Sequence, residues 1–225
     1  MDRLFNMDNK FFTFMSRVAD LIILNLICIA CCVPIVTIGP ALTALFYMTM
    51  KMIRNEESYI VRGYFKSFKE NLKQGIIINL IMLAAGFLLF FDFRIAQSME
   101  GNMGKIMFFL LAFILLIYLM VFLYIYPVLA KFYNTIRNTF VNAFLMSVRH
   151  LPYTLLMVLV TVMPFVLFFT GSAQVQSIEL GLSMLLGISG IAFINSWFLV
   201  RIFDNYIPKE EVPEEEKQDS MEGEH

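Results

Sequence analysis

The chain alternates long apolar runs with shorter polar segments. Four of the runs carry no charged residue, and the first and longest carries a single acid, Asp20. A helix needs about 20 apolar residues to cross the ~30 Å hydrocarbon core of a bilayer, so each run predicts a membrane-spanning helix. We therefore expect an all-α, polytopic membrane protein with about five spanning helices. The runs cover residues 18–50, 75–91, 106–130, 151–170 and 180–200, of which the second is short.

The first run is too long for one span and contains its own interruption. A straight helix over residues 18–53 would be about 54 Å long at 1.5 Å per residue. Pro34 lacks the N–H that a helix interior needs, whereas Pro40 suits the first turn of a new helix. The stretch "VPIVTIGP" (33–40, the elbow) thus predicts a stop, a short link and a restart, with Gly39 supplying backbone freedom. Alternatively, the break lines a binding path, and then Thr37, the only hydroxyl side chain of the link, would be needed.

The second half of the chain repeats this order. Pro127 lies near the end of a spanning run, as the prolines of the elbow do, and "FLMSVR" (144–149) matches "YFKSFK" (64–69) in its pattern. We interpret this as a divergent twofold repeat of helix, proline elbow, amphipathic arm and helix. Its units are residues 18–93 and 106–170, followed by a last helix at 180–203. Chance similarity between aromatic-rich segments is the alternative.

Two amphipathic arms connect the spanning helices, the first arm at residues 51–73 and the second arm at 131–149. In the second arm, Phe140, Phe144 and Val148 recur every four residues, with polar residues between them. Helices of this kind lie at the headgroup boundary, pack on a helical bundle or receive a partner. The pattern by itself does not choose among these three.

Composition agrees with a membrane location. Hydrophobic residues make up 59% of the 225 positions and charged residues 16%, whereas soluble domains average about 45–50% and 25%. Residues 1–17 form an amphipathic N-terminal segment before the single membrane domain at 18–207. Residues 208–225 are rich in acidic side chains and lack periodicity, so we expect them to be disordered.

The distribution of Lys and Arg predicts the orientation. The first arm holds six basic residues and the second arm three, whereas 94–105 holds two and 171–179 none. Because basic residues accumulate on the cytoplasmic side, both arms and the C-terminal tail should be cytoplasmic. Five crossings put the N-terminus outside. A return of residues 41–52 through the membrane would make six crossings and put both termini inside, but about 12 residues are short for a span.

Candidate functional chemistry is sparse. Asp20 and Asn25 are polar residues within the first run, where such residues are the usual pointers to function. Cys28, Cys31 and Cys32 have no accompanying His or second Cys pair, so we interpret them as packing residues. No phosphate-binding loop, metal-ligand motif or nucleophile elbow is present, so we expect no enzyme activity, no cofactor and no metal. The basic residues are better explained by lipid than by nucleic acid.

The block at residues 2–75 resembles the YesL-type family of small bacterial multi-pass membrane proteins. The resemblance rests on Asp20 and Asn25, on "PIVTIGPALTALFY" (34–47) and on "SYIVRGYFKSFKENLKQ" (58–74). It implies a protein of undefined biochemical role, encoded near genes for carbohydrate uptake and polysaccharide degradation. We therefore expect an accessory or regulatory component that binds a sugar permease or another membrane protein. The alternative is a small transporter in its own right, with a path between the two repeats.

Overall fold

The structure is a computed structural model that describes residues 2–56 and 59–206. Within these residues every regular element is a helix and none is a strand, which confirms the all-α expectation. The acidic tail at 208–225 lies outside the described residues. The helices are α1 (Asp2–Cys32), η1 (Ile35–Thr37), α2 (Ile38–Arg54), α3 (Ile60–Glu70), α4 (Leu72–Ser98), α5 (Gly101–Lys131), α6 (Ile136–Arg149), α7 (Leu151–Thr170), α8 (Ala173–Leu182), η2 (Ser183–Gly187) and α9 (Ile188–Phe203).

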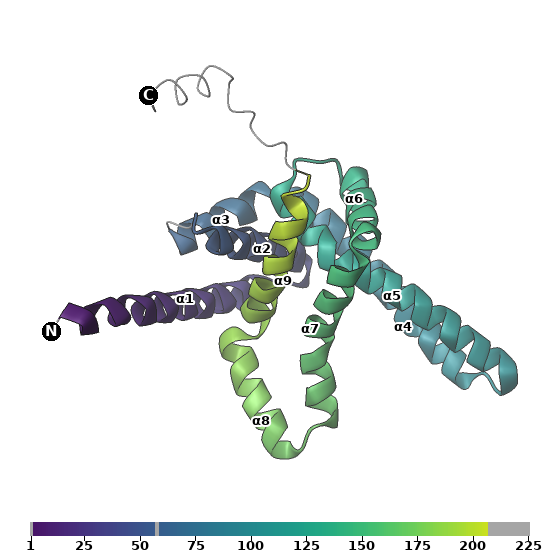
Figure 1. Cartoon of the computed structure of the whole chain (residues 1–225). Coiled ribbons are helices and arrows are strands. Elements are labelled where there is room, and N and C mark those ends of the chain that lie inside the picture. The colour runs from purple at the N-terminus through teal and green to yellow at the C-terminus, as the bar shows by residue number, and fades with distance from the viewer. Residues whose placement is uncertain (1, 57–58, 207–225) are drawn as a thin grey trace, which may run out of the picture.

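The helices radiate from a common centre (Figure 1). α4 and α5 form one long hairpin, α7 and α8 form a second, and α1 projects in a third direction. α2 and the ends of α5 and α9 meet at the centre, with α3 and α6 beside them. The turns at the tips of both hairpins lie far from α3 and α6 (Figure 1). The N-terminal residues 2–17 continue directly into the first span as part of α1 instead of forming a separate segment.

The described residues contain six helices that are long and apolar enough to cross a membrane, so the chain is a polytopic membrane protein. The sixth contains residues 41–52, which were expected to be too short for a span. In the structure the helical stretch is longer, because it runs from Ile35 to Arg54 and covers 20 residues. It differs from the others in its surroundings. In this helix, 61% of the most apolar 18-residue stretch is buried inside the protein, against 11–17% in the other five helices. α2 is therefore the interior helix, and the others present their apolar surface outward.

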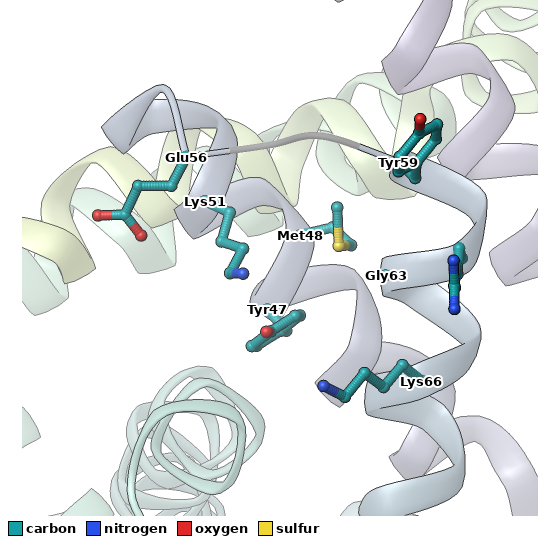
Figure 2. A pocket seen from close by; sticks show the side chains of 8 residues that line it. Tyr47, Met48, Lys51, Glu56, Tyr59, Gly63 and Lys66 are labelled. Carbon is teal, nitrogen blue, oxygen red and sulfur yellow. The ribbon is translucent and has the colours of Figure 1, made fainter.

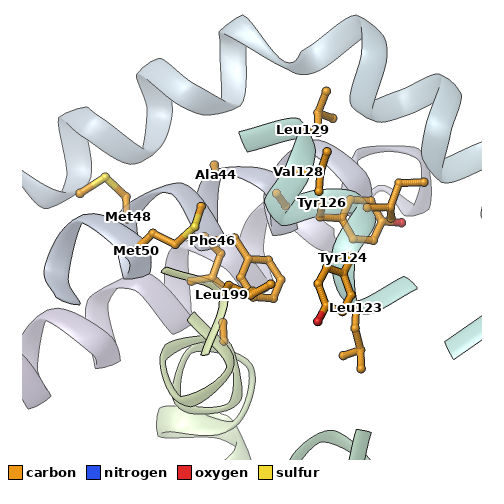
Figure 3. Packing of buried hydrophobic residues seen from close by; sticks show 14 of the residues in the cluster. Ala44, Phe46, Met48, Met50, Leu123, Tyr124, Tyr126, Val128, Leu129 and Leu199 are labelled. Carbon is orange, nitrogen blue, oxygen red and sulfur yellow. The ribbon is translucent and has the colours of Figure 1, made fainter. Parts of the chain in front are cut away.

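The centre of the molecule is filled by side chains from both halves of the chain. Ala44 and Phe46 of α2 pack in one buried cluster with Tyr124 and Tyr126 of α5 and Leu199 of α9 (Figure 3). Hydroxyl groups connect the helices inside this cluster. The Thr49 and Ser196 hydroxyls are 2.7 Å apart, and those of Tyr124 and Thr154 are 2.8 Å apart. Hydrogen bonds between membrane helices typically stabilise by about 0.6–2 kcal/mol, so they add specificity to the apolar packing.

The predicted repeat has different bounds in the structure. α5 continues through Pro127 to Lys131, so this proline does not form an elbow, and the break comes later, at residues 132–135. In the first half, α2 stands between the elbow and α3. The order that does recur is α2–α3–α4 and α5–α6–α7. In both copies the arm helix leads into the next helix through one residue, Asn71 or His150.

α6 packs largely through small and polar residues, whereas α3 buries Ile60, Tyr64 and Ser67. α6 buries Thr139, Ala143 and Ser147, whereas Phe144 and Val148 remain exposed. Small residues let helix backbones approach closely, which is the usual basis of helix contact in membranes. α3 is held by Tyr64, whose hydroxyl donates a 3.1 Å hydrogen bond to the Ala41 carbonyl. Burial raises the pKa of Tyr64, so this phenol remains a neutral donor.

Candidate functional site

The elbow is a compact turn closed by one side chain. α1 ends at Cys32, Pro34 has extended backbone angles (φ −75°, ψ 117°), and α2 begins at Ile38. The Thr37 hydroxyl lies 2.7 Å from the Cys31 carbonyl oxygen and 2.7 Å from that of Pro34. The Cys31 carbonyl lies in the last turn of α1, where carbonyls lack partners within the helix, whereas the Pro34 carbonyl also accepts a 3.0 Å hydrogen bond from the Thr37 backbone N–H. Thr37 therefore has a structural partner within the turn and does not require a bound ligand to satisfy it.

Gly39 has a role that sequence reasoning did not predict. It lies inside α2, in ordinary helical backbone, so conformational freedom is not the reason for glycine here. A Cβ at this position would collide with the Gly75 carbonyl and come within 2.8 Å of the Asn79 Cβ. In turn, a Cβ on Gly75 would lie 2.8 Å from the Pro40 nitrogen. The two glycines thus allow α2 and α4 to cross in direct backbone contact, beside the first turn that Pro40 occupies as predicted.

Asn79 connects this crossing to the elbow and to the second half. Its side-chain amide donates a 2.9 Å hydrogen bond to the Ile35 carbonyl in η1. Its oxygen accepts a 3.3 Å hydrogen bond from the Tyr126 hydroxyl of α5. One buried amide therefore joins the elbow, α4 and α5.

Asn25 holds a second discontinuity, the π-helical turn η2 between α8 and α9. Its amide nitrogen donates to the Ser183 and Met184 carbonyls at 3.3 and 2.8 Å. Its oxygen accepts from the Ile188 and Ser189 backbone N–H groups, both at 3.0 Å. A π-helical turn interrupts the regular ladder of backbone hydrogen bonds, and unpaired backbone is costly in a membrane. The fully buried Asn25 side chain supplies partners on both sides of that interruption.

Asp20 lies apart from these contacts and is only half-buried. Near it, the Arg17 guanidinium donates to the side chain of Asn55, the residue that caps α2 in left-handed conformation (φ 55°). Next to Asn55, Arg54 forms an ion pair with Asp204 after α9. The predicted set of Asp20, Asn25, elbow residues and Pro127 is thus distributed over several positions and does not form one site.

A second kind of feature is a polar hollow, the α2–α3 pocket (Figure 2). It has a volume of about 340 Å³ and lies between the last turns of α2 and the first turns of α3. Lys51 and Lys66 extend into the space between the helices (Figure 2), and the Lys51 ammonium lies 5.0 Å from the centroid of the Tyr47 ring. The lining residues are Tyr47, Met48, Lys51, Glu56, Tyr59, Arg62, Gly63 and Lys66.

Three cations and one carboxylate give this pocket a net positive charge, and two phenols add hydrogen-bonding groups. Such a lining suits an anionic group, either a carboxylate or a phosphate. The sequence indicated the basic residues as an orientation signal, but not that they gather around a pocket. Tyr47 and Tyr59 were missed altogether, although the one-turn spacing of Tyr47 and Lys51 is a signal that could have been used.

Comparison with known proteins gave a match over the part of the chain that contains this pocket. Residues 21–93 match a family model described as "Protein of unknown function, DUF624". The match extends from the middle of α1 through the elbow, α2 and α3 and into α4. No curated protein and no solved structure matches the chain. The match supports a relationship to a family without an assigned function, and it includes Asn25, Gly39 and the α2–α3 pocket.

Proposed function

We propose that this protein is a non-enzymatic accessory component of a bacterial cell membrane that binds an acidic cytoplasmic segment of another membrane protein. The observation that carries the proposal is the α2–α3 pocket, in which Lys51, Arg62 and Lys66 surround a space of about 340 Å³. The carboxylates of an acidic segment would be complementary to these cations. The partner class that we propose is a carbohydrate permease, on the strength of the family resemblance of residues 2–75.

A transporter with a path between the two halves is the second candidate. The interior between the halves argues against it, because Phe46, Tyr124, Tyr126 and Leu199 are packed together there. A path for a sugar would have to displace these side chains and would offer few polar groups to replace water. The accessory role requires no such displacement, since the α2–α3 pocket is already open at the surface.

Co-purification tests the accessory role. We expect the tagged full chain, extracted from its own cells in mild detergent, to retain a carbohydrate permease identified by mass spectrometry. The variant Arg62→Glu/Lys66→Glu should lose the permease, because it reverses two charges of the pocket. The control Lys69→Glu/Lys73→Glu makes the same change in net charge on exposed residues outside the pocket and should retain it. Equal recovery with both variants, or no permease with the wild type, would contradict the proposal.

The cytoplasmic position of the pocket is a separate prediction. After replacement of the native cysteines, single cysteines at Glu56 and Asn138 should resist a membrane-impermeant thiol reagent in intact cells. A cysteine at Ser98, at the tip of the α4–α5 hairpin, should react. All three positions are exposed, so protection reports the side of the membrane and not burial in the protein. Labelling at Glu56 in intact cells would place the pocket outside and overturn the topology.

A further inference from the structure

A large apolar cavity lies between α7 and the α8–η2–α9 segment. Its volume is about 690 Å³, which is within the ~300–1,000 Å³ range of small-molecule pockets. Val160, Leu167 and Leu186 are among the apolar side chains that line it. At its edge Ile178 and Leu182 remain exposed on the surface of a candidate spanning helix. A ligand could therefore enter the cavity from the bilayer.

One acidic side chain, Glu179 of α8, borders this cavity and also a second cavity of about 340 Å³ beside it. The Glu179 Oε2 atom is buried, and within residues 2–56 and 59–206 it has no hydrogen-bond partner. A carboxylate in a low-dielectric region is costly unless a positive charge or a proton compensates it. Glu179 thus has one buried oxygen that the described side chains around it do not satisfy by hydrogen bonding, and a cation in the cavity would complement it.

The walls of the two cavities are suited to a cation with an apolar body. The second cavity is lined by Phe165, Phe168 and Phe169, and the negative faces of aromatic rings attract ammonium-type cations. Both cavities also border helix discontinuities. Pro164 interrupts the hydrogen-bond ladder of α7, and η2 interrupts that of α8 and α9. Backbone that departs from a regular helix at membrane depth is tolerated where it borders a cavity or is buried in protein.

We propose that this pair of cavities is a binding site for a lipophilic monocation, such as a hydrophobic amine or a quaternary onium ion, with Glu179 as its counter-charge. The apolar walls accommodate the body of the ligand. Glu179 then discriminates in favour of a cation over neutral compounds of the same size. The site is independent of the α2–α3 pocket and does not depend on the proposed accessory role.

Equilibrium dialysis of the full chain in an uncharged maltoside detergent tests this site, with radiolabelled tetraphenylphosphonium as the probe. We expect saturable binding to the wild type and a loss of affinity of about tenfold or more with Glu179→Gln, because the substitution removes a partly desolvated counter-charge. Glu100→Gln removes the same charge at an exposed position before α5 and should bind as the wild type does.

Two further variants separate loss of charge from loss of fold. Glu179→Asp keeps the charge and should retain saturable binding. Ile191→Trp also keeps the charge, but it fills space that both cavities share and should therefore weaken binding. Wild-type affinity in Glu179→Gln would overturn the proposal, because it would show that partition into apolar space suffices. Non-saturable uptake by the wild type, or a tightly bound neutral lipid that excludes the probe, would overturn it as well.

Discussion

Gly39→Leu is expected to lower the stability of the membrane domain by about 3 kcal/mol or more, at or beyond the upper end of overpacking effects. The reason is geometric. At this position the backbones of α2 and α4 are in contact, so the first atom of any side chain would meet the Gly75 carbonyl. The helices would have to separate, and the hydrogen bond from Asn79 to the Ile35 carbonyl would be lost with them. Thermal unfolding in detergent and the amount of protein in the membrane both measure this loss.

Thr37→Val is the matched control for Gly39→Leu, because it changes the same elbow without adding a helix clash. It removes the hydroxyl that lies 2.7 Å from two carbonyl oxygens. We expect a loss of about 1 kcal/mol, in line with a single hydrogen bond. The two variants should therefore differ strongly in the amount of folded protein in the membrane. A normal protein level together with the growth phenotype of a deletion strain in Thr37→Val would instead identify the elbow as a functional site.

Asn25→Leu is expected to cost about 2–3 kcal/mol, because one substitution removes the partners of four backbone groups. Leucine has the same number of side-chain heavy atoms in the same branched arrangement but cannot form hydrogen bonds, so most of the effect should come from the Ser183 and Met184 carbonyls and the Ile188 and Ser189 N–H groups. We expect η2 to rearrange and α1 to detach from α9. Limited proteolysis near residues 183–189, together with thermal unfolding, should report both changes.

Asn195→Leu is the control for this prediction. Asn195 is also buried and lies in α9, but its side chain makes a single hydrogen bond, to Thr161, and its oxygen has no partner within the described residues. The substitution should therefore cost less than Asn25→Leu. Equal effects would show that burial of an amide, and not its contacts with η2, determines the stability.

The break in the first apolar run illustrates how far local sequence reasoning extends. Pro34 and Pro40 predicted where α1 ends and where α2 begins, because proline acts on the backbone within one turn of itself. The same reasoning failed for Pro127, which α5 accommodates only four residues before its own end. Pro127 is buried between Tyr126 and Val128 of the central cluster, so packing around it maintains a helix that its local effect alone would weaken.

The count of candidate spans also required the three-dimensional structure. Five runs were evident because lipid-facing helices are apolar throughout and their composition is sufficient to identify them. α2 was harder to identify because it is an interior helix, and interior contacts replace part of the apolar surface that a lipid-facing helix needs. Thr43 and Thr49, for example, are buried there and hydrogen-bonded.

The class of this protein, the approximate positions of its helices and the location of the elbow were predictable from the sequence. These properties depend on composition and on residues within a few turns of one another. The close approach at Gly39 and the partners of Asn25 became evident only from the arrangement of the helices, and so did the pocket around Lys51 and Lys66 and the cavity beside Glu179. Each of these features brings together residues of different helices that are 15 to more than 150 positions apart in the chain. The geometry with which helices cross has no local signature in the sequence.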